Sequence, residues 1–269
     1  MIVVAYSLRD PAGSGSAKLL LELTRGEETT CAGAVECYST PMGLIAGYRE
    51  DVVELEALQE LSPAADAFIV MSRHSAESGR KTFSVHHPGN PTETPHGGRP
   101  RSLALSFPGL SKALMLNYRE TSRGLGGFEL TLEATHHGPT EVGRPVVFIE
   151  IGSTEAEWRN EEAQKAMALA VLRTLEGGPR SCKAAVGIGG THYPARFTRM
   201  HLEEDVCFGH ILARYQMTGV TEDVLRQALE RTYPETPQLV FVEKKSVKRE
   251  QKELIERIAA ERGAVVEYL

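Results

Sequence analysis

The chain lacks the segments that define membrane and exported proteins. No apolar run approaches the roughly 20 residues that a membrane-spanning helix needs. The first residues, Met1 to Tyr6, have no basic n-region of the kind that opens a signal peptide, and we expect them to form a first strand. The sequence therefore predicts a soluble, cytoplasmic protein with no membrane partner.

Closely spaced cysteine pairs are also missing. The four cysteines, Cys31, Cys37, Cys182 and Cys207, include no C-x-x-C pair. This spacing argues against a thiolate zinc site and against a disulfide framework. In a cytoplasmic protein we expect four reduced, mostly buried thiols.

Several catalytic signatures and an overall positive charge are absent as well. The sequence has no G-x-S-x-G elbow, no P-loop and no H-E-x-x-H motif, which weakens a serine-hydrolase, an NTPase and a zincin interpretation. The net charge of −6 provides no general attraction for nucleic acid. An RNA partner would have to be held by a local basic patch.

Apolar, β-rich runs alternate with helical patterns along the chain. Strands are expected at 2–6, 67–71, 103–107, 128–134, 146–151, 184–188, 210–215 and 239–242. Helices are expected at 18–23, 52–61, 110–123, 155–176, 222–232 and 248–262. This alternation predicts a three-layer α/β domain around a mixed, mostly parallel sheet. We expect one domain over residues 1–269, with a long Pro/Gly-rich loop at 86–100 that is functional or mobile.

The most informative segment is the T-H-H-G-P motif at 135–139. The strand expected at 128–134 runs directly into its two imidazoles, and the strand at 146–151 follows closely. The carboxylates of Glu133 and Glu150 therefore fall near the same strand ends, where α/β proteins bind ligands. Neighbouring residues on a strand point to opposite faces, so the pattern leaves open whether both imidazoles reach one cleft.

Other histidines also fall at expected strand ends or in glycine-rich loops; they are His74, His86, His87 and His192. Before His192, the pair Gly189-Gly190 allows backbone amides to approach an anion closely. Ser153 and its neighbour Thr154 open the helix expected at 155–176, either as an anion site or, as we favour, as a simple cap. Imidazoles and carboxylates are normal zinc ligands, so distant segments can together hold zinc.

These motifs, taken in order, resemble the D-aminoacyl-tRNA deacylase family of the archaeal and plant type. The resemblance runs from the first strand to the terminal helix, and it is carried by His74-Ser75, Val85-His86, Gly89-Asn90, Glu133 to Pro139, Glu150 to Ser153, Gly189 to Tyr193 and Gly209-His210. It implies hydrolysis of the ester between a D-amino acid and tRNA, which is a translation quality-control reaction. It also implies zinc (Zn2+) as the cofactor and a phosphorylase/peptidyl-tRNA hydrolase-like fold.

Ester hydrolysis needs an activated water, a stabilised oxyanion and a proton for the departing ribose hydroxyl. The candidate catalytic residues are His136, His137, Glu133 and His74. The candidate metal ligands are His136, His137, His86, His192 and Glu150. The candidate substrate-binding residues are Asn90, Gly138, Gly189, Gly190, Tyr193, Ser153, Lys244, Lys245, Lys248 and Arg249, with backbone amides of the glycines as oxyanion donors.

Two questions stay open at this point. The basic segment from Lys244 to Lys252 either contacts tRNA phosphates or is a solvated helix face, since glutamates are interleaved with it. The activity is either that of a deacylase or that of a metal-dependent peptidase or nucleoside-processing hydrolase acting on a small molecule. A non-catalytic RNA-binding module is disfavoured, because binding alone does not need clustered imidazoles. No protein partner is evident, and we expect a monomer.

Overall fold

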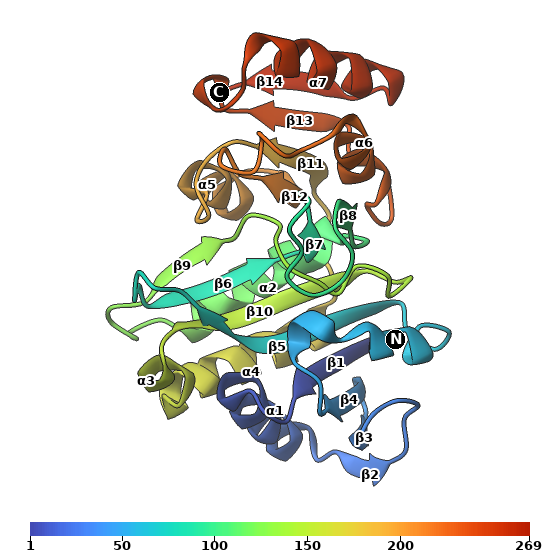
Figure 1. Cartoon of the computed structure of the whole chain (residues 1–269). Coiled ribbons are helices and arrows are strands. Elements are labelled where there is room, and N and C mark those ends of the chain that lie inside the picture. The colour runs from blue at the N-terminus through green and yellow to red at the C-terminus, as the bar shows by residue number, and fades with distance from the viewer.

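The computed structural model describes all residues from Met1 to Leu269, which build two sheets placed one above the other (Figure 1). The larger sheet has eight strands in the order β2-β3-β4-β1-β5-β10-β6-β9. Their bounds are β1 (Ile2–Ser7), β2 (Glu27–Thr29), β3 (Glu36–Thr40), β4 (Gly43–Tyr48), β5 (Ala67–Ser75), β6 (Thr82–His86), β9 (Glu129–Leu132) and β10 (Val146–Ser153). At its centre β4, β1, β5 and β10 are all parallel, whereas β6 runs antiparallel to β10.

The two faces of the larger sheet are covered differently. Helices α1 (Pro11–Thr24), α2 (Pro108–Thr121) and α4 (Glu161–Gly177) pack on one face, and the 3-10 turns η1 (Val52–Glu54) and η2 (Glu56–Leu61) pack on the other. Successive residues of β1 alternate between the two cores, with Val4 on the first side and Val3 on the second. This alternation follows from the two-residue period of a strand.

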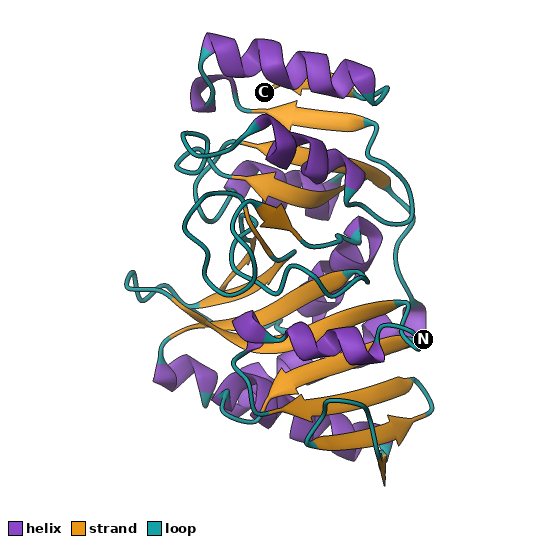
Figure 2. Ribbon diagram, turned by 45° about the vertical axis from the view of Figure 1, so that its right-hand side comes forward, coloured by secondary structure: helices purple, strands orange, loops and turns teal.

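The smaller sheet is wholly parallel, in the order β12-β11-β13-β14. Its strands are β11 (Lys183–Ile188), β12 (Val206–Leu212), β13 (Leu239–Val242) and β14 (Val265–Tyr268). Helices α5 (Ala195–Glu203), α6 (Glu222–Glu230) and α7 (Arg249–Glu261) connect them, and a two-stranded ribbon of β7 (Gly89–Asn90) and β8 (Ser102–Leu103) lies beside them. Figure 2 shows the helices flanking both sheets. The predicted three-layer α/β class with a mixed, mostly parallel sheet is confirmed.

One apolar core runs through both sheets. It joins Ile149 of β10 and Leu114 of α2 to Phe208 and Ile211 of β12. A shared core supports the single domain expected for residues 1–269, which stays a prediction. No helix combines the length and the apolar composition that crossing a membrane requires.

The helix expected at 155–176 is in fact two helices. Thr154 and Glu157 form the predicted capping box at the start of α3 (Glu155–Trp158). A second helix, α4, begins after Asn160, whose side chain accepts a hydrogen bond from the Ala163 amide at 2.9 Å and caps it. Asparagine favours caps over helix interiors because its side chain competes for backbone amides. Of the strand expected at 103–107, only Leu103 lies in a strand, β8, and residues 104–107 lead into α2, which begins at Pro108.

The expectation of four reduced thiols was wrong. The structure pairs Cys31 with Cys37 and Cys182 with Cys207, and leaves no free cysteine. Cys182 precedes the first residue of β11 and Cys207 lies on β12, and in the parallel register of these strands Lys183 pairs with Val206. The second bridge therefore depends on strand pairing, which no local cysteine spacing reveals.

Candidate active site

Three neighbouring strands bring acidic and imidazole side chains to one end of the larger sheet. On the parallel pair β5 and β10, Gly152 lies opposite His74, and Glu150 lies opposite Ser72. On the other side of β10, His86 of β6 pairs with Phe148. The register therefore brings His74, His86 and Glu150 together at the same end of the sheet.

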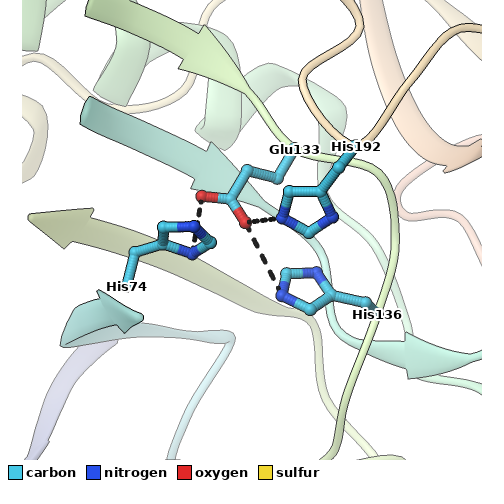
Figure 3. A group of neighbouring side chains, drawn as sticks. All are labelled: His74, Glu133, His136 and His192. Carbon is cyan, nitrogen blue, oxygen red and sulfur yellow. Dashed lines mark hydrogen bonds and ion pairs between the residues drawn. The ribbon is translucent and has the colours of Figure 1, made fainter. Parts of the chain in front are cut away.

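Glu133, directly after β9, lies at the centre of the cluster (Figure 3). One oxygen, Oε1, is 3.2 Å from Nδ1 of His74. The other, Oε2, is 2.9 Å from Nε2 of His192 and 3.6 Å from Nε2 of His136. His192 comes from the loop after β11, so this carboxylate joins the two sheets.

A second carboxylate, Glu150, lies beside the first. Ser72 Oγ donates to Glu150 Oε1 at 2.8 Å, and Glu150 Oε2 is 3.5 Å from His74 Nδ1 and 3.6 Å from His86 Nε2. Burial alone would raise the pKa of each carboxyl. The hydrogen bonds from His192 and His74 nevertheless hold the pKa of Glu133 well below its usual value. His86 and His74 likewise lower the pKa of Glu150, despite burial and the charge of Glu133. The site therefore buries two negative charges.

His74 carries a compensating positive charge. Burial lowers its pKa, but Glu133 and Glu150 outweigh that effect and raise the pKa of His74 to about 11. Its Nδ1 faces the carboxylates, and its Nε2 donates to the hydroxyl of Tyr193 at 2.7 Å. The indole of Trp158 donates to the His74 carbonyl at 2.9 Å and holds the end of β5 in place.

Both imidazoles of the T-H-H-G-P motif reach one pocket, which answers the question that strand alternation left open. Nδ1 of His136 lies 2.9 Å from the Ala134 carbonyl, and Nδ1 of His137 lies 2.6 Å from the Gly138 carbonyl. A carbonyl only accepts, so each Nδ1 carries the proton and each Nε2 keeps its lone pair. His137 has φ of +49°, which is a left-handed backbone conformation. Its ring therefore does not follow the alternation of side chains along a strand.

These two imidazoles are neutral. Burial, with the neighbouring rings of His137 and His86, holds the pKa of His136 well below 6.5. Burial and His86 lower the pKa of His137 to about 4. The pocket that they line has a volume of about 260 Å³ and also contains His74, Glu150, Arg73 and Asp51.

The donor set fits a divalent metal ion. Both ring nitrogens of His86 and Oε2 of Glu150 are buried without a hydrogen bond, and the nearest partners of this Oε2 are His74 and His86, at the ion-pair distances of 3.5 and 3.6 Å given above. Three overlapping groups have ligand atoms within 4.8 Å of one another: His74, Glu133, His136 and His192; His86, His136 and His137; His86, Glu133 and Glu150. An imidazole that binds the backbone through Nδ1 and offers Nε2 is the usual form of a metal ligand. All five residues that we expected as ligands belong to these groups.

The glycine amides expected to bind an oxyanion are already used. The amide of Gly138 donates to His96 O at 2.9 Å, and that of Gly189 donates to Leu212 O at 2.8 Å. The amide of Gly190 donates to Glu243 Oε2 at 2.8 Å. Oxyanion stabilisation must therefore come from side chains of the site, and none of these three glycines lines its pocket.

Two other expected substrate contacts have internal partners as well. The Asn90 amide group donates to Gly97 O and Arg99 O and accepts from the His96 amide, which holds the loop at 86–100 together. Ser153 is buried, and its hydroxyl donates to Arg80 O. The capping that we favoured at 153–154 holds for Thr154, whose amide donates to Glu157 in the capping box of α3, whereas Ser153 takes no part in the cap.

The basic segment adjoins the site from the second sheet. Lys244 and Lys245 lie in η3 (Lys244–Ser246), directly after Glu243, whose carboxylate holds the Gly190 amide next to His192. Both lysines and Lys248 are exposed and make no ion pair, whereas Arg249 pairs with Glu253 at 2.9 Å. Of the four basic residues that we expected to contact the substrate, the three lysines therefore carry a charge that no acidic side chain pairs.

The pattern of the sequence did not reveal the residues that support the cluster. Tyr118 donates to the Glu150 carbonyl at 3.2 Å, and Ser72 and Trp158 hold Glu150 and His74 as described. Tyr118 and Trp158 lie within ordinary helix patterns and carry no local signal, and Ser72 lies just beyond the strand expected at 67–71, with nothing local to link it to Glu150. His87, in contrast, lies outside the cluster, with Nδ1 3.0 Å from Gly209 O.

The fold and the site define a three-layer α/β enzyme with a buried imidazole–carboxylate cluster at its strand ends. Within that class, the chain belongs to the D-aminoacyl-tRNA deacylase family, whose model matches residues 61–267. It is 48% identical to the D-aminoacyl-tRNA deacylase of Aeropyrum pernix, over 100% of this chain and 99% of that protein. It is 38% identical to the one of Staphylothermus marinus, over 99% and 98%. A crystal structure of the conserved protein of unknown function AF0625 superposes with a TM-score of 0.93 at 33% identity, covering 100% of this chain and 95% of that one.

Proposed function

We propose that this chain hydrolyses the ester bond of D-aminoacyl-tRNA in the cytoplasm, releasing the free D-amino acid and tRNA. The observation that carries the proposal is the buried Glu133, which joins His74, His136 and His192 beside a pocket of about 260 Å³. A cluster of ionisable groups with displaced pKa values at strand ends is typical of a catalytic site.

We further propose that the site holds zinc through His86, His136 and His137, with Glu133 and Glu150 beside them. When bound, the ion would polarise the ester carbonyl and acidify water. Two buried carboxylates need two units of positive charge, and His74 supplies one. A divalent cation at the atoms of His86 and Glu150 that make no hydrogen bond would supply the second unit and leave the cluster with one net positive charge.

The chain's own side chains position the reacting groups. Glu133 Oε2 holds His192 and faces His136, and it can accept a proton from a water molecule bound in the pocket beside them. His74 donates through Nε2 to Tyr193 Oη, so the hydroxyl proton of Tyr193 stays free to hydrogen-bond the substrate. With the glycine amides occupied, this hydroxyl is our candidate oxyanion or leaving-group donor.

The tRNA would dock along the basic segment. Lys244, Lys245 and Lys248 follow Glu243, which binds the Gly190 amide in the loop that carries His192, and they can contact phosphates without making the whole protein basic. A chain that acts alone on tRNA needs no protein partner, and we keep the monomer as a proposal.

The decisive experiment compares matched D- and L-aminoacyl-tRNA, with and without a strong chelator. We expect D-selective hydrolysis that the chelator abolishes and zinc restores. Full activity in a demonstrably metal-free preparation would overturn the zinc proposal alone. Turnover of free D-amino-acid esters or peptides, without turnover of tRNA esters, would instead support the small-molecule hydrolase, which family membership disfavours.

A further inference from the structure

The T-H-H-G-P motif is attached to the second sheet through one residue, Thr135. The Thr135 amide donates to the carbonyl of Ile211 on β12 at 2.8 Å, and the Ile211 amide donates back to Thr135 Oγ1 at 3.2 Å. The preceding amide, that of Ala134, donates to the His192 carbonyl at 2.9 Å. The chain that leaves the edge strand of the larger sheet therefore pairs with the edge strand of the smaller one.

A buried glutamine fixes the other side of the same peptide. Nε2 of Gln216 donates to the Thr135 carbonyl at 2.8 Å, and its Oε1 accepts from the Ala213 amide at 2.8 Å. Gln216 is 5% exposed, so neither bond is exchanged readily for water. The peptide that links Thr135 to His136 is thus held at its carbonyl oxygen.

His210 determines the direction of the Thr135 hydroxyl proton. Nε2 of His210 lies 2.9 Å from the Ala104 carbonyl, which only accepts, so Nε2 carries the ring proton. Nδ1 is then an acceptor, and Thr135 Oγ1, 3.1 Å away, donates to it. Burial lowers the pKa of His210 to about 4, which keeps this ring neutral. The hydrogen bonds that run from the Ala104 carbonyl through His210 to Thr135 therefore fit only one placement of the protons.

We propose that His210 is a positioning residue of the active site, which acts through the Thr135 hydroxyl to fix the backbone that carries His136 and His137. The inference rests on the proposed deacylase function. None of His210, Thr135 and Gln216 lines the pocket, so none of them touches substrate there. The left-handed backbone of His137 is a conformation that persists only where the surroundings hold it.

The test uses paired variants of the full chain. Thr135→Val keeps the shape of the side chain but removes the hydroxyl, whereas Thr135→Ser keeps the hydroxyl. His210→Phe removes both ring nitrogens, and His210→Asn keeps an acceptor near the position of Nδ1. The control is Thr174→Val, which removes an equally buried hydroxyl that bonds Asn117 and Ala170 within and beside α4.

We expect Thr135→Val and His210→Phe to lower kcat by about 10- to 100-fold with little change in KM, as supporting residues of a metal site do. Zinc affinity, measured by chelator competition, should fall by a similar factor. Thr135→Ser should recover both values, and His210→Asn should recover part of them. Thr174→Val should leave both unchanged, even if it lowers Tm.

Nitrogen NMR of the wild-type imidazoles gives an independent readout, because it distinguishes a protonated ring nitrogen from an unprotonated one. We expect His210 to carry its proton on Nε2 and none on Nδ1; the reverse would overturn the proposal. Equal kcat and zinc affinity in Thr135→Val and the control would also overturn it, as would failure of Thr135→Ser to rescue. A wild-type chain inactive on D-aminoacyl-tRNA would refute the function instead, and the zinc and NMR measurements would still decide the positioning role.

Discussion

Nδ1 of His74, on β5, lies 3.2 Å from Oε1 of Glu133, which follows β9 at the far edge of the same sheet. Strands β10 and β6 lie between β5 and β9, and their side chains Glu150 and His86 belong to the same cluster. The contact joins an imidazole whose pKa the two carboxylates raise to about 11 to the carboxylate that also holds His192.

The first prediction concerns the T-H-H-G-P imidazoles. His136→Ala and His137→Ala should each lower kcat by about 10²- to 10⁴-fold, the usual cost of losing a general base or a metal ligand. Each Nε2 keeps its lone pair toward the pocket, so zinc content per chain should also fall. Steady-state kinetics and metal analysis provide the measurement.

His→Asn at the same positions keeps a hydrogen-bonding group but removes basicity, and should not restore activity. Circular dichroism should show an intact fold for every variant. If both alanine variants keep wild-type kcat, the motif is structural, and the catalytic group must be sought among His74, His86 and His192.

The second prediction concerns the basic segment. Replacing Lys244, Lys245 and Lys248 with Ala should raise KM for aminoacyl-tRNA and leave kcat nearly unchanged, because these side chains are exposed beside the site. If each contacts one phosphate, the log–log salt slope should fall by about two to three units in total. Arg249 adds little, since it is paired with Glu253.

The matched control removes the same amount of charge from α1 and α4 by replacing Lys18, Lys165 and Arg173 with Ala. That variant should keep the wild-type KM and salt slope. A similar change in both triple variants would show that net charge, and not docking at the basic segment, controls binding.

The third prediction concerns Gly138. A Cβ atom built there would lie 2.6 Å from the Val53 carbonyl oxygen and 2.7 Å from the Gly97 and Gly98 backbone. Because backbone cannot move aside cheaply, Gly138→Ala should displace the motif and reduce kcat by at least about tenfold, the lower end of the loss from a disturbed metal site. Gly126→Ala, with nothing within 4 Å, is the control and should behave as wild type. An active Gly138→Ala would show that the packing of this turn does not matter.

The fourth prediction concerns acid stability. His201 on α5 is buried, and burial together with the charge of Lys112 lowers its pKa to about 3. The folded pKa lies below the unfolded value of 6.5, so the unfolded state binds more protons in acid. This contribution to stability is complete above pH 6.5 and is lost as the pH falls toward 3, at up to about 1.4 kcal/mol per pH unit for each such histidine.

Unfolding free energies measured between pH 7 and pH 4 should therefore show a slope that His201→Gln reduces by about one proton. Thr232→Val, which removes a buried hydroxyl bonded to Ser106, should lower stability without altering the slope. An unchanged slope in His201→Gln would mean that this histidine is protonated in the folded state.

Local patterns in the chain are enough to predict the architecture and the members of the cluster. Alternation in strands and helical periodicity identified most central strands and the α/β class, because both periods are set by backbone geometry within a few residues. The same is true of Glu150, which lies in the recognisable strand β10, and of Glu133, His136 and His137, which follow the recognisable strand β9. The sequence patterns did not predict strand β6 or the break between two helices at Asn160, since their signals are short and resemble their surroundings.

The partners of these residues were decided only by tertiary contacts. A strand pattern cannot show that φ at His137 is +49°, so that both imidazoles face one pocket. Nor can it show that the amides of Gly138, Gly189 and Gly190 are occupied, because their acceptors come from distant segments. Cys182 and Cys207 meet through the pairing of β11 with β12, and Thr135 meets His210 across the two sheets. Periodicity is a property of neighbours along the chain, whereas a hydrogen-bond partner or a disulfide partner is set by how separate strands come together in space.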